Sequence, residues 1–145
     1  MKISVTNSHR GLGLAISKRF ENVIDGFDEN SDVFINNRHN SFKQTELLLE
    51  VFNKWKDTEK TIVNIVSRSK YPNISKGYLY SASKASLSHL SNSLRFVSDK
   101  KCRIIDINPG LLESELPSLS YDEIVDTIEY CINLPIHIAV GEISI

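Results

Sequence analysis

Tyr80 and Lys84 are the two residues whose types and spacing most directly suggest chemistry. They are four positions apart in a stretch with helical periodicity, so their side chains should share one face of a helix. An ammonium group beside a phenol favours the phenolate and lowers the pKa of the phenol. The phenol then becomes a usable proton donor or acceptor near neutral pH. Such a pair also arises by chance, so it carries weight only together with other signals.

A hydroxyl and a glycine pair lie at the ends of two predicted strands. Ser67 follows the β-branched segment 61–66, where its hydroxyl could polarise a carbonyl oxygen, although a turn or capping role is at least as common. Gly11 and Gly13 stand between the first strand and a helix. Glycines there let the backbone approach a phosphate, which the free N–H groups of the helix N-terminus attract. A plain turn is the alternative, and the position after the first strand favours phosphate binding.

Alternating strands and helices must position these residues. Strands are predicted at 2–6, 23–27, 32–35, 61–66, 103–107 and 136–145, and helices at 12–20, 41–56, 78–97 and 122–131. This alternation predicts a parallel, doubly wound sheet with helices on both faces. Ser41 is a candidate N-cap for the second helix. Every polar cluster lies at the carboxyl end of a predicted strand, which is where such sheets bind ligands.

Composition limits the function classes. A chain of 145 residues, 41% of them hydrophobic, can bury one core, and we expect one domain over 1–145. The net charge of −1 gives no attraction for nucleic acid or an anionic membrane. No apolar run is long enough to span a membrane, and 1–6 does not resemble a signal peptide. Cys102 and Cys131 are predicted to be buried free thiols, so a cytoplasmic location is expected. The four His residues are scattered, so no metal site is expected.

Four motifs follow one another in a specific order. TNSHRGLG at 6–13 is similar to the TGxxxGxG cofactor loop of the short-chain dehydrogenase/reductase family, and 32–37 resembles the strand that ends in its NNAG motif. Ser67 with YSASK at 80–84 resembles the family's catalytic serine and YxxxK, and PGLLES at 109–114 resembles PGxxxT. Counting back from Ser67 places Asn40 at the family's active-site asparagine, with a helix cap as an equally weighted alternative. The resemblance spans the whole chain.

The resemblance implies an NAD(P)-dependent oxidoreductase that transfers a hydride between nicotinamide and a small carbonyl or alcohol substrate. Ser67 would hold the carbonyl oxygen, Tyr80 would act as general acid or base, and Lys84 would lower the Tyr80 pKa and bind the nicotinamide ribose. Asn40 would order a water that relays protons. The residues implied in cofactor binding are Thr6, Asn7, Ser8, Arg10, Gly11, Leu12, Gly13, Asn36, Asn37, Tyr80, Lys84, Pro109, Gly110, Leu112 and Ser114.

The chain is much shorter than members of that family, and most of the loss falls between the first helix and 32–35. The predicted fold class is α/β: a three-layer, Rossmann-like, doubly wound parallel sheet that is truncated, with the second and third strands and their helices largely missing. Because the lost strands belong at one edge, the rest of the sheet could stay intact. The first strand would be exposed at 3–5 unless 23–27 or a partner subunit covers it.

The missing region normally contacts the adenosine half of the cofactor, including the residue that distinguishes NAD from NADP. Asp25 or Asp28 could supply a ribose-binding acid, whereas Arg10 resembles the basic residue of NADP-using members. We expect NADP(H) to be slightly preferred over NAD(H), with weak binding possible. Asn7 replaces the first glycine of the loop, and Asn tolerates glycine-like backbone angles best.

A second hypothesis is a binding module with little or no catalysis that acts by oligomerising with itself or with full-length relatives. Helices 41–56 and 78–97 keep their apolar faces and correspond to the helices that form family dimers, so a homo-oligomer (dimer or tetramer) is expected. The joint presence of Asn40, Ser67, Tyr80 and Lys84 favours the enzyme. A shortened loop after Ser114 predicts an open substrate site.

Overall fold

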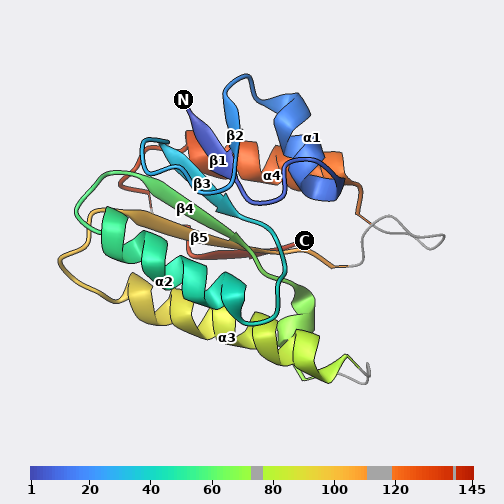
Figure 1. The fold of residues 1–145 in the computed structure, drawn as a ribbon. Coiled ribbons are helices and arrows are strands. Elements are labelled where there is room, and N and C mark those ends of the chain that lie inside the picture. Colours follow the sequence, from blue (N-terminus) through green and yellow to red (C-terminus); the bar gives the residue numbers. More distant parts are fainter. Residues whose placement is uncertain (73–76, 111–118, 139) are drawn as a thin grey trace.

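The computed structural model describes residues 1–72, 77–110, 119–138 and 140–145 (Figure 1). The strands are β1 (Ile3–Val5), β2 (Val23–Asp25), β3 (Val33–Asn36), β4 (Thr61–Ile65), β5 (Arg103–Asn108) and β6 (Glu142–Ser144). The helices are α1 (Gly11–Arg19), α2 (Lys43–Trp55), α3 (Tyr78–Arg95), α4 (Tyr121–Asn133) and a short 3₁₀ helix, η1 (Arg68–Lys70). The strands form one parallel sheet in the order β2-β1-β3-β4-β5-β6.

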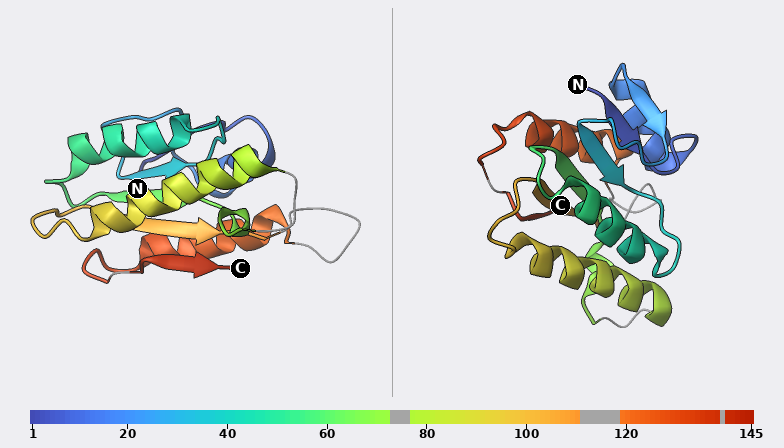
Figure 2. Two further views of the ribbon diagram at one scale, coloured as in Figure 1. Left: turned by 90° about the horizontal axis from the view of Figure 1, so that it is seen from below. Right: turned by 60° about the vertical axis from the view of Figure 1, so that its left-hand side comes forward.

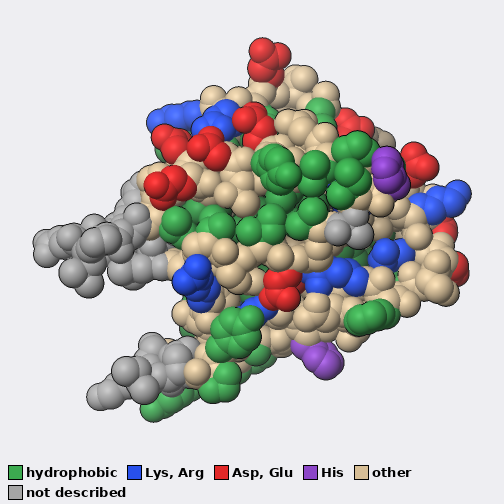
Figure 3. Space-filling view, turned by 180° about the vertical axis from the view of Figure 1, so that it is seen from behind, with side chains coloured by type: hydrophobic (Ala, Val, Ile, Leu, Met, Phe, Trp, Pro, Cys, Tyr) green, Lys and Arg blue, Asp and Glu red, His purple; other side chains and the backbone are tan. Residues whose placement is uncertain are grey.

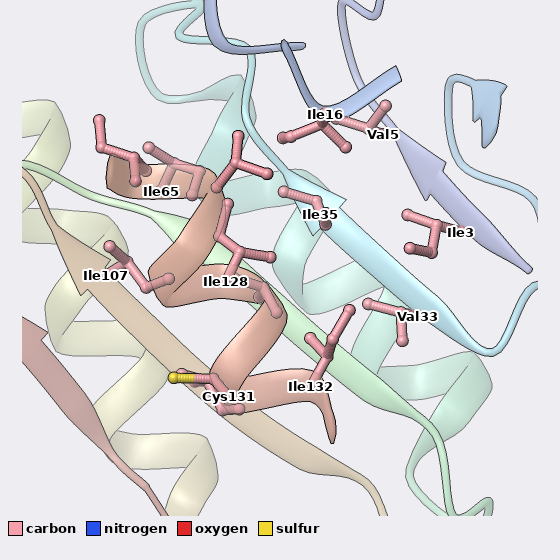
Figure 4. Close-up of a cluster of buried hydrophobic side chains, with 14 of the residues drawn as sticks. Ile3, Val5, Ile16, Val33, Ile35, Ile65, Ile107, Ile128, Cys131 and Ile132 are labelled. Atoms are coloured by element: carbon pink, nitrogen blue, oxygen red, sulfur yellow. The ribbon is translucent and has the colours of Figure 1, made fainter. Parts of the chain in front are cut away.

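Two helical layers cover the sheet, α1 and α4 on one face and α2 and α3 on the other (Figures 1 and 2). Strands buried on both faces must be apolar in nearly every position, and β3, β4 and β5 are buried throughout. Ile128, Cys131 and Ile132 of α4 pack on the strand residues of one face (Figure 4). Trp55 of α2 and Leu87 of α3 belong to the core of the other face. The predicted three-layer, Rossmann-like fold is therefore confirmed.

A short strand and a direct connection occupy the place of the missing elements. β2 pairs in parallel with β1, with Val5 opposite Asp25, so of the two possibilities left open for this edge, the segment 23–27 or a partner subunit, the first applies, and 23–25 makes the pairing. The chain then crosses from β2 to β3 without a helix. Phe27 in this connection packs edge-on against Phe34 and Trp55, with ring centroids 5.1 and 5.4 Å apart. The apolar face that a helix would cover is thus partly covered by one aromatic ring.

The beginning of α2 differs from the prediction. The helix starts at Lys43, and its N-cap position is Phe42, which makes no side-chain capping hydrogen bond. Ser41 lies one position earlier in the left-handed backbone region, at φ 52°. The expectation that Ser41 caps this helix was therefore wrong, because the chain turns sharply at Ser41 before the helix begins.

The last strand is shorter than predicted. β6 covers only Glu142–Ser144, because the Ile138 N–H donates to the Pro135 carbonyl oxygen in a turn. Within the described part of the chain, no helix has both the length and the apolar character that crossing a bilayer requires. Acidic and basic side chains are interspersed around a band of hydrophobic side chains on the face seen in Figure 3. Cys102 and Cys131 are buried and free, as predicted.

Candidate active site

A cavity of about 610 Å³ opens where β1, β3, β4 and β5 end. It is lined by Asn7, Arg10, Gly11, Leu12, Asn37, Arg38, His39, Ile65, Val66, Ser67, Tyr80, Lys84, Pro109, Gly110 and Tyr121. The carboxyl ends of parallel strands are where doubly wound folds bind their ligands. Most of the predicted site residues therefore meet in one place, although Leu112 and Ser114 lie outside the described residues.

The loop between β1 and α1 is a tight turn with two positive φ angles. Asn7 takes the place of a glycine with φ 63°, and Gly11 follows with φ 56° at the first position of α1. A Cβ on Gly13 would lie 1.7 Å from the Asn7 carbonyl oxygen, so only glycine lets the helix come this close. A tight turn, a close approach to phosphate and close helix packing are the three tasks of the glycines in a dinucleotide-binding loop.

Two side chains fasten this loop to the neighbouring strands. The Thr6 hydroxyl oxygen accepts hydrogen bonds from the N–H groups of Asn37 and Arg38, at 2.9 and 2.8 Å. The Ser8 N–H and hydroxyl both donate to Asp25 Oδ1 at 2.9 Å. These bonds, the backbone one first, lower the pKa of Asp25 below its usual value. Thr6 and Ser8 thus shape the loop from behind and are not among the residues that line the cavity.

The two acids proposed to bind ribose lie at opposite ends of the sheet. Asp25 ends β2 beside the loop, and the His9 Nε2 lies 3.5 Å from its Oδ2. Asp28 instead pairs with the Lys2 ammonium group at 2.9 Å, and Lys2 precedes β1 at the amino edge. Only Asp25 is therefore placed to meet a ligand held by the loop.

Tyr80 and Lys84 share one face of α3, as predicted, and both line the cavity. Tyr80 is 41% exposed, whereas Lys84 is only 3% exposed. The Lys84 ammonium group lies 5.7 Å from the centre of the Tyr80 ring. Burial lowers the pKa of Lys84 from 10.5 to about 8. A cation close to a solvent-accessible phenol is the arrangement that proton transfer by the phenol requires.

Ser67 caps a turn and also lines the cavity. Its hydroxyl oxygen accepts the Ser69 N–H at 3.0 Å and so caps η1. The same residue lines the cavity together with Tyr80 and Lys84. A hydroxyl that caps a turn is held in place, and it can still donate its own proton toward the cavity.

Comparison with known proteins agrees with this geometry. A family model described as short chain dehydrogenase matches residues 27–123. The chain belongs to the short-chain dehydrogenase family. A search of curated proteins found no match.

Solved structures of dehydrogenases share the fold. The serine dehydrogenase from Escherichia coli is 18% identical with a TM-score of 0.80, and the match covers 100% of this chain and 97% of that one. An alcohol dehydrogenase from Thermococcus sibiricus, complexed with 5-hydroxy-NADP, is 17% identical with a TM-score of 0.80 and coverage of 100% and 96%. A 4-hydroxyisoleucine dehydrogenase complexed with NADH is 20% identical with a TM-score of 0.74 and coverage of 100% and 96%.

Asn40 is the predicted catalytic residue of this short-chain dehydrogenase that lies apart from the others. Its side chain is exposed and does not line the cavity, and its carbonyl oxygen accepts the Lys43 N–H at 3.0 Å. The left-handed turn at Ser41 separates it from α2. The structure therefore brings Ser67, Tyr80 and Lys84 together, and the role of Asn40 stays a prediction.

Gln44, rather than Asn40, contacts Lys84. Lys84 Nζ donates to Gln44 Oε1 and to the Ile65 carbonyl oxygen, both at 2.9 Å. Asn36, predicted to bind cofactor, is fully buried beneath this contact and donates to the carbonyl oxygen of Gln44 at 3.0 Å. Gln44 is not among the residues predicted from the sequence. The feature of the sequence that could have identified Gln44 is a polar side chain on the same helix face as the apolar residues Leu48 and Val51 of α2.

His39 is a second residue that the sequence did not single out. Its ring contacts the Tyr80 ring edge-on, with centroids 4.6 Å apart. Burial, and then the charge of Lys84, lower the pKa of His39 below its usual value. The feature of the sequence that could have identified His39 is a departure from the NNAG motif of the family. Arg38 and His39 occupy the positions of its alanine and glycine. In the part of the chain that the structure describes, no cluster of His, Cys, Asp or Glu could hold a metal ion.

Proposed function

We propose that this short-chain dehydrogenase is an NAD(P)-dependent oxidoreductase that transfers a hydride between nicotinamide and a small carbonyl or alcohol substrate. The observation that carries the proposal is the meeting of Ser67, Tyr80 and Lys84 in one cavity with the glycine loop. The loop is similar to a dinucleotide-binding loop in one respect, because Gly13 packs too closely against the Asn7 carbonyl oxygen to allow a Cβ. Membership of the family supports the same reaction class.

The chain supplies the proton chemistry of this reaction, and a bound nicotinamide supplies the hydride. Reduction of a carbonyl adds hydride to carbon and a proton to oxygen. The Ser67 hydroxyl would donate a hydrogen bond to that oxygen, and the Tyr80 phenol would give up its proton to it. The Lys84 ammonium group would stabilise the phenolate that remains. Alcohol oxidation would run through the same groups in reverse.

The activity test is the oxidation of NADH and NADPH by a panel of small aldehydes and ketones. We expect turnover by the wild-type protein and a loss of at least about 100-fold in Tyr80→Phe, because positioned general acids contribute about that much. Tyr130→Phe is the matched control, since Tyr130 is 65% exposed on α4 and away from the cavity. Full activity in Tyr80→Phe, or no turnover of any carbonyl, would contradict the proposal.

For the cofactor, we propose that NAD(H) binds more tightly than NADP(H). The expectation of NADP(H) rested on Arg10, which lines the cavity. The carboxylate of Asp25 lies beside the same loop at the end of β2, where an acid accepts a hydrogen bond from the ribose 2′-hydroxyl and repels a 2′-phosphate. Asp25 is ionised at neutral pH, and the hydrogen bonds from Ser8 lower its pKa further.

Paired affinity measurements test this preference. Asp25→Asn should shift the ratio of NADH to NADPH affinity toward NADPH by about tenfold or more, since loss of the carboxylate removes the repulsion. Asp28→Asn makes the same change at the opposite end of the sheet, where Asp28 pairs with Lys2, and should leave the ratio unchanged. A wild-type preference for NADPH that Asp25→Asn does not alter would refute the assignment.

We also propose that the protein forms a homo-oligomer through α2 and α3. Large apolar side chains are exposed on or next to these helices, with exposed fractions of 42% for Phe42, 43% for Leu49 and 79% for Leu79. Sedimentation should show a dimer or tetramer that Leu49→Lys weakens and Tyr130→Lys does not.

The alternative of a non-catalytic module is favoured by one observation, the edge position of β2, which leaves the adenosine side open. Oligomerisation without cofactor binding would support that alternative.

A further inference from the structure

Lys84 is an almost completely buried cation whose hydrogen bonds go to neutral groups. Its side chain is 3% exposed, and no salt bridge within the described residues involves it. Two acceptors hold the ammonium group, Gln44 Oε1 and the Ile65 carbonyl oxygen, each at 2.9 Å. An ammonium group has three N–H donors, so one is left to serve the cavity that Lys84 lines.

The amide of Gln44 is itself fixed by its surroundings. Its Nε2 donates to the carbonyl oxygens of Asn36 at 2.7 Å and Ile65 at 3.1 Å. Rotating the amide by half a turn would break both bonds and bring its NH₂ group against the ammonium group of Lys84. The oxygen must therefore face Lys84, which settles the orientation of a group that is otherwise ambiguous.

Asn36 completes the support of Gln44 from the sheet. Its Nδ2 donates to the Gln44 carbonyl oxygen at 3.0 Å and to Asn64 Oδ1 at 3.1 Å. Gln44 is 3% exposed, and Asn36 and Asn64 are completely buried. The first turn of α2 is thus tied to β3, to β4 and, through Lys84, to α3.

We propose that Gln44 is the positioning residue of Lys84, whose amide oxygen directs the ammonium group toward Tyr80. This task differs from the one that the sequence resemblance implies for Asn40, which is to order a water that relays protons. The inference rests on the proposed function, because it assigns a task at the same site. A neutral acceptor suits the task, because it stabilises the positive charge without neutralising it as a carboxylate would.

The pKa of Lys84 separates this role from a merely structural one. Burial without compensation lowers the pKa of a lysine, and a nearby acceptor or anion opposes that effect. Because the pKa of Lys84 is about 8, a titration can detect both a rise and a fall of this pKa in a variant. If the Gln44 oxygen holds the ammonium group, changing that oxygen must move the Lys84 pKa even in the absence of cofactor.

The experiment is an NMR titration of lysine side chains in the cofactor-free protein, with the Lys84 signal assigned by its loss in Lys84→Met. Gln44→Glu should raise the pKa by about one unit or more, because an opposite charge favours the ammonium form. Gln44→Met should lower it, because one acceptor is lost. Asn40→Asp is the matched control for charge, and it should leave the Lys84 pKa within about 0.3 units because Asn40 is exposed outside the cavity.

The outcomes are distinct. An unchanged Lys84 pKa in Gln44→Glu, or an equal shift in Asn40→Asp, overturns the proposal. Gln44→Glu keeps the size of the side chain and an oxygen toward Lys84 but loses the two hydrogen bonds that Nε2 donates, and it gives a second, independent variant if Gln44→Met fails to fold. Because the titration needs neither cofactor nor turnover, a shifted pKa in a protein that reduces no carbonyl would refute the proposed function and leave the positioning role standing.

Discussion

At the scale of single residues, the loop of the site depends on close packing at Gly13, where a side chain would not fit. The Asn7 carbonyl oxygen occupies the space that a side chain on Gly13 would need, at 1.7 Å from its Cβ. Gly13→Ala should lower the free energy of unfolding by about 3 kcal/mol, the upper end of the usual cost of overpacking. Chemical denaturation measures this. Gly141→Ala, with its nearest neighbour at 3.8 Å, should change little, and equal stability of the two variants would contradict the close packing.

The charge of Lys84 gives the site a pH dependence. Because its pKa is about 8, the ammonium group is nearly fully present at pH 7 and half lost at pH 8. In the proposed mechanism, carbonyl reduction uses the Tyr80 proton and the charge of Lys84, so the rate should fall as the pH rises through about 8. Lys84→Arg keeps its charge, and its pH profile should lack this fall. A fall at the same pH in Lys84→Arg would assign it to another group.

The lowered pKa of Lys84 also affects the stability of the fold. Stability should rise with pH, whereas activity should fall. A lysine whose pKa is lower in the folded state binds its proton more weakly there than in the unfolded chain. The resulting penalty is full below pH 8 and disappears as the pH approaches 10.5. Lys84→Met should therefore gain stability relative to the wild type at neutral pH and lose that advantage in alkali, as urea denaturation at several pH values would show.

At the scale of elements, α4 is held at its start by a reciprocal cap. Ser120 Oγ accepts the Glu123 N–H at 3.2 Å, and Glu123 Oε2 accepts the Ser120 N–H at 2.9 Å. Ser120→Ala should lower the free energy of unfolding by about 1 kcal/mol. Ser93→Ala removes an exposed hydroxyl that donates to the His89 carbonyl oxygen within α3 and should change the free energy of unfolding by less than about 0.5 kcal/mol. Equal effects would show that the cap contributes nothing.

Periodicity predicted the helices but not their local beginnings. Leu48, Val51 and Phe52 repeat at helical spacing and are buried, so α2 was evident in the sequence. Its start was not, because the left-handed turn at Ser41 has no signal in the residue type. The position of Asn40 in the sequence, counted back from Ser67, predicted it as the site residue. Residue counting does not reveal the turn at Ser41, after which Gln44 and not Asn40 contacts Lys84.

At the scale of the whole molecule, Phe27 covers part of the apolar face that a helix between β2 and β3 would cover. Its ring joins the connection after β2 to Phe34 and Trp55 in the core. Phe27→Ala should lower the free energy of unfolding by about 2 kcal/mol, somewhat below the cost for a fully buried phenylalanine because Phe27 is only partly buried. Phe96→Ala is the control, since Phe96 is 86% exposed. Similar stability of the two variants would mean that the connection is not anchored.

The parallel sheet could be predicted because strands alternate with helices along the chain, and the site because Ser67, Tyr80 and Lys84 keep the family's spacing. The path of the chain from β2 to β3 could not. It depends on contacts between Phe27 and Trp55, which are far apart in the sequence. The same holds for His39 and Tyr80, whose contact exists only once α3 is packed on the sheet.

The central claim is that this shortened short-chain dehydrogenase still holds a nicotinamide cofactor, and calorimetric titration with NADH tests it most directly. Gly13→Asp fills the space at the loop and adds a negative charge, whereas Tyr80→Phe removes one hydroxyl from the lining of the cavity. We predict saturable binding to the wild type and to Tyr80→Phe, and none to Gly13→Asp. No binding of NADH or NADPH to the wild type up to millimolar concentration would contradict the account.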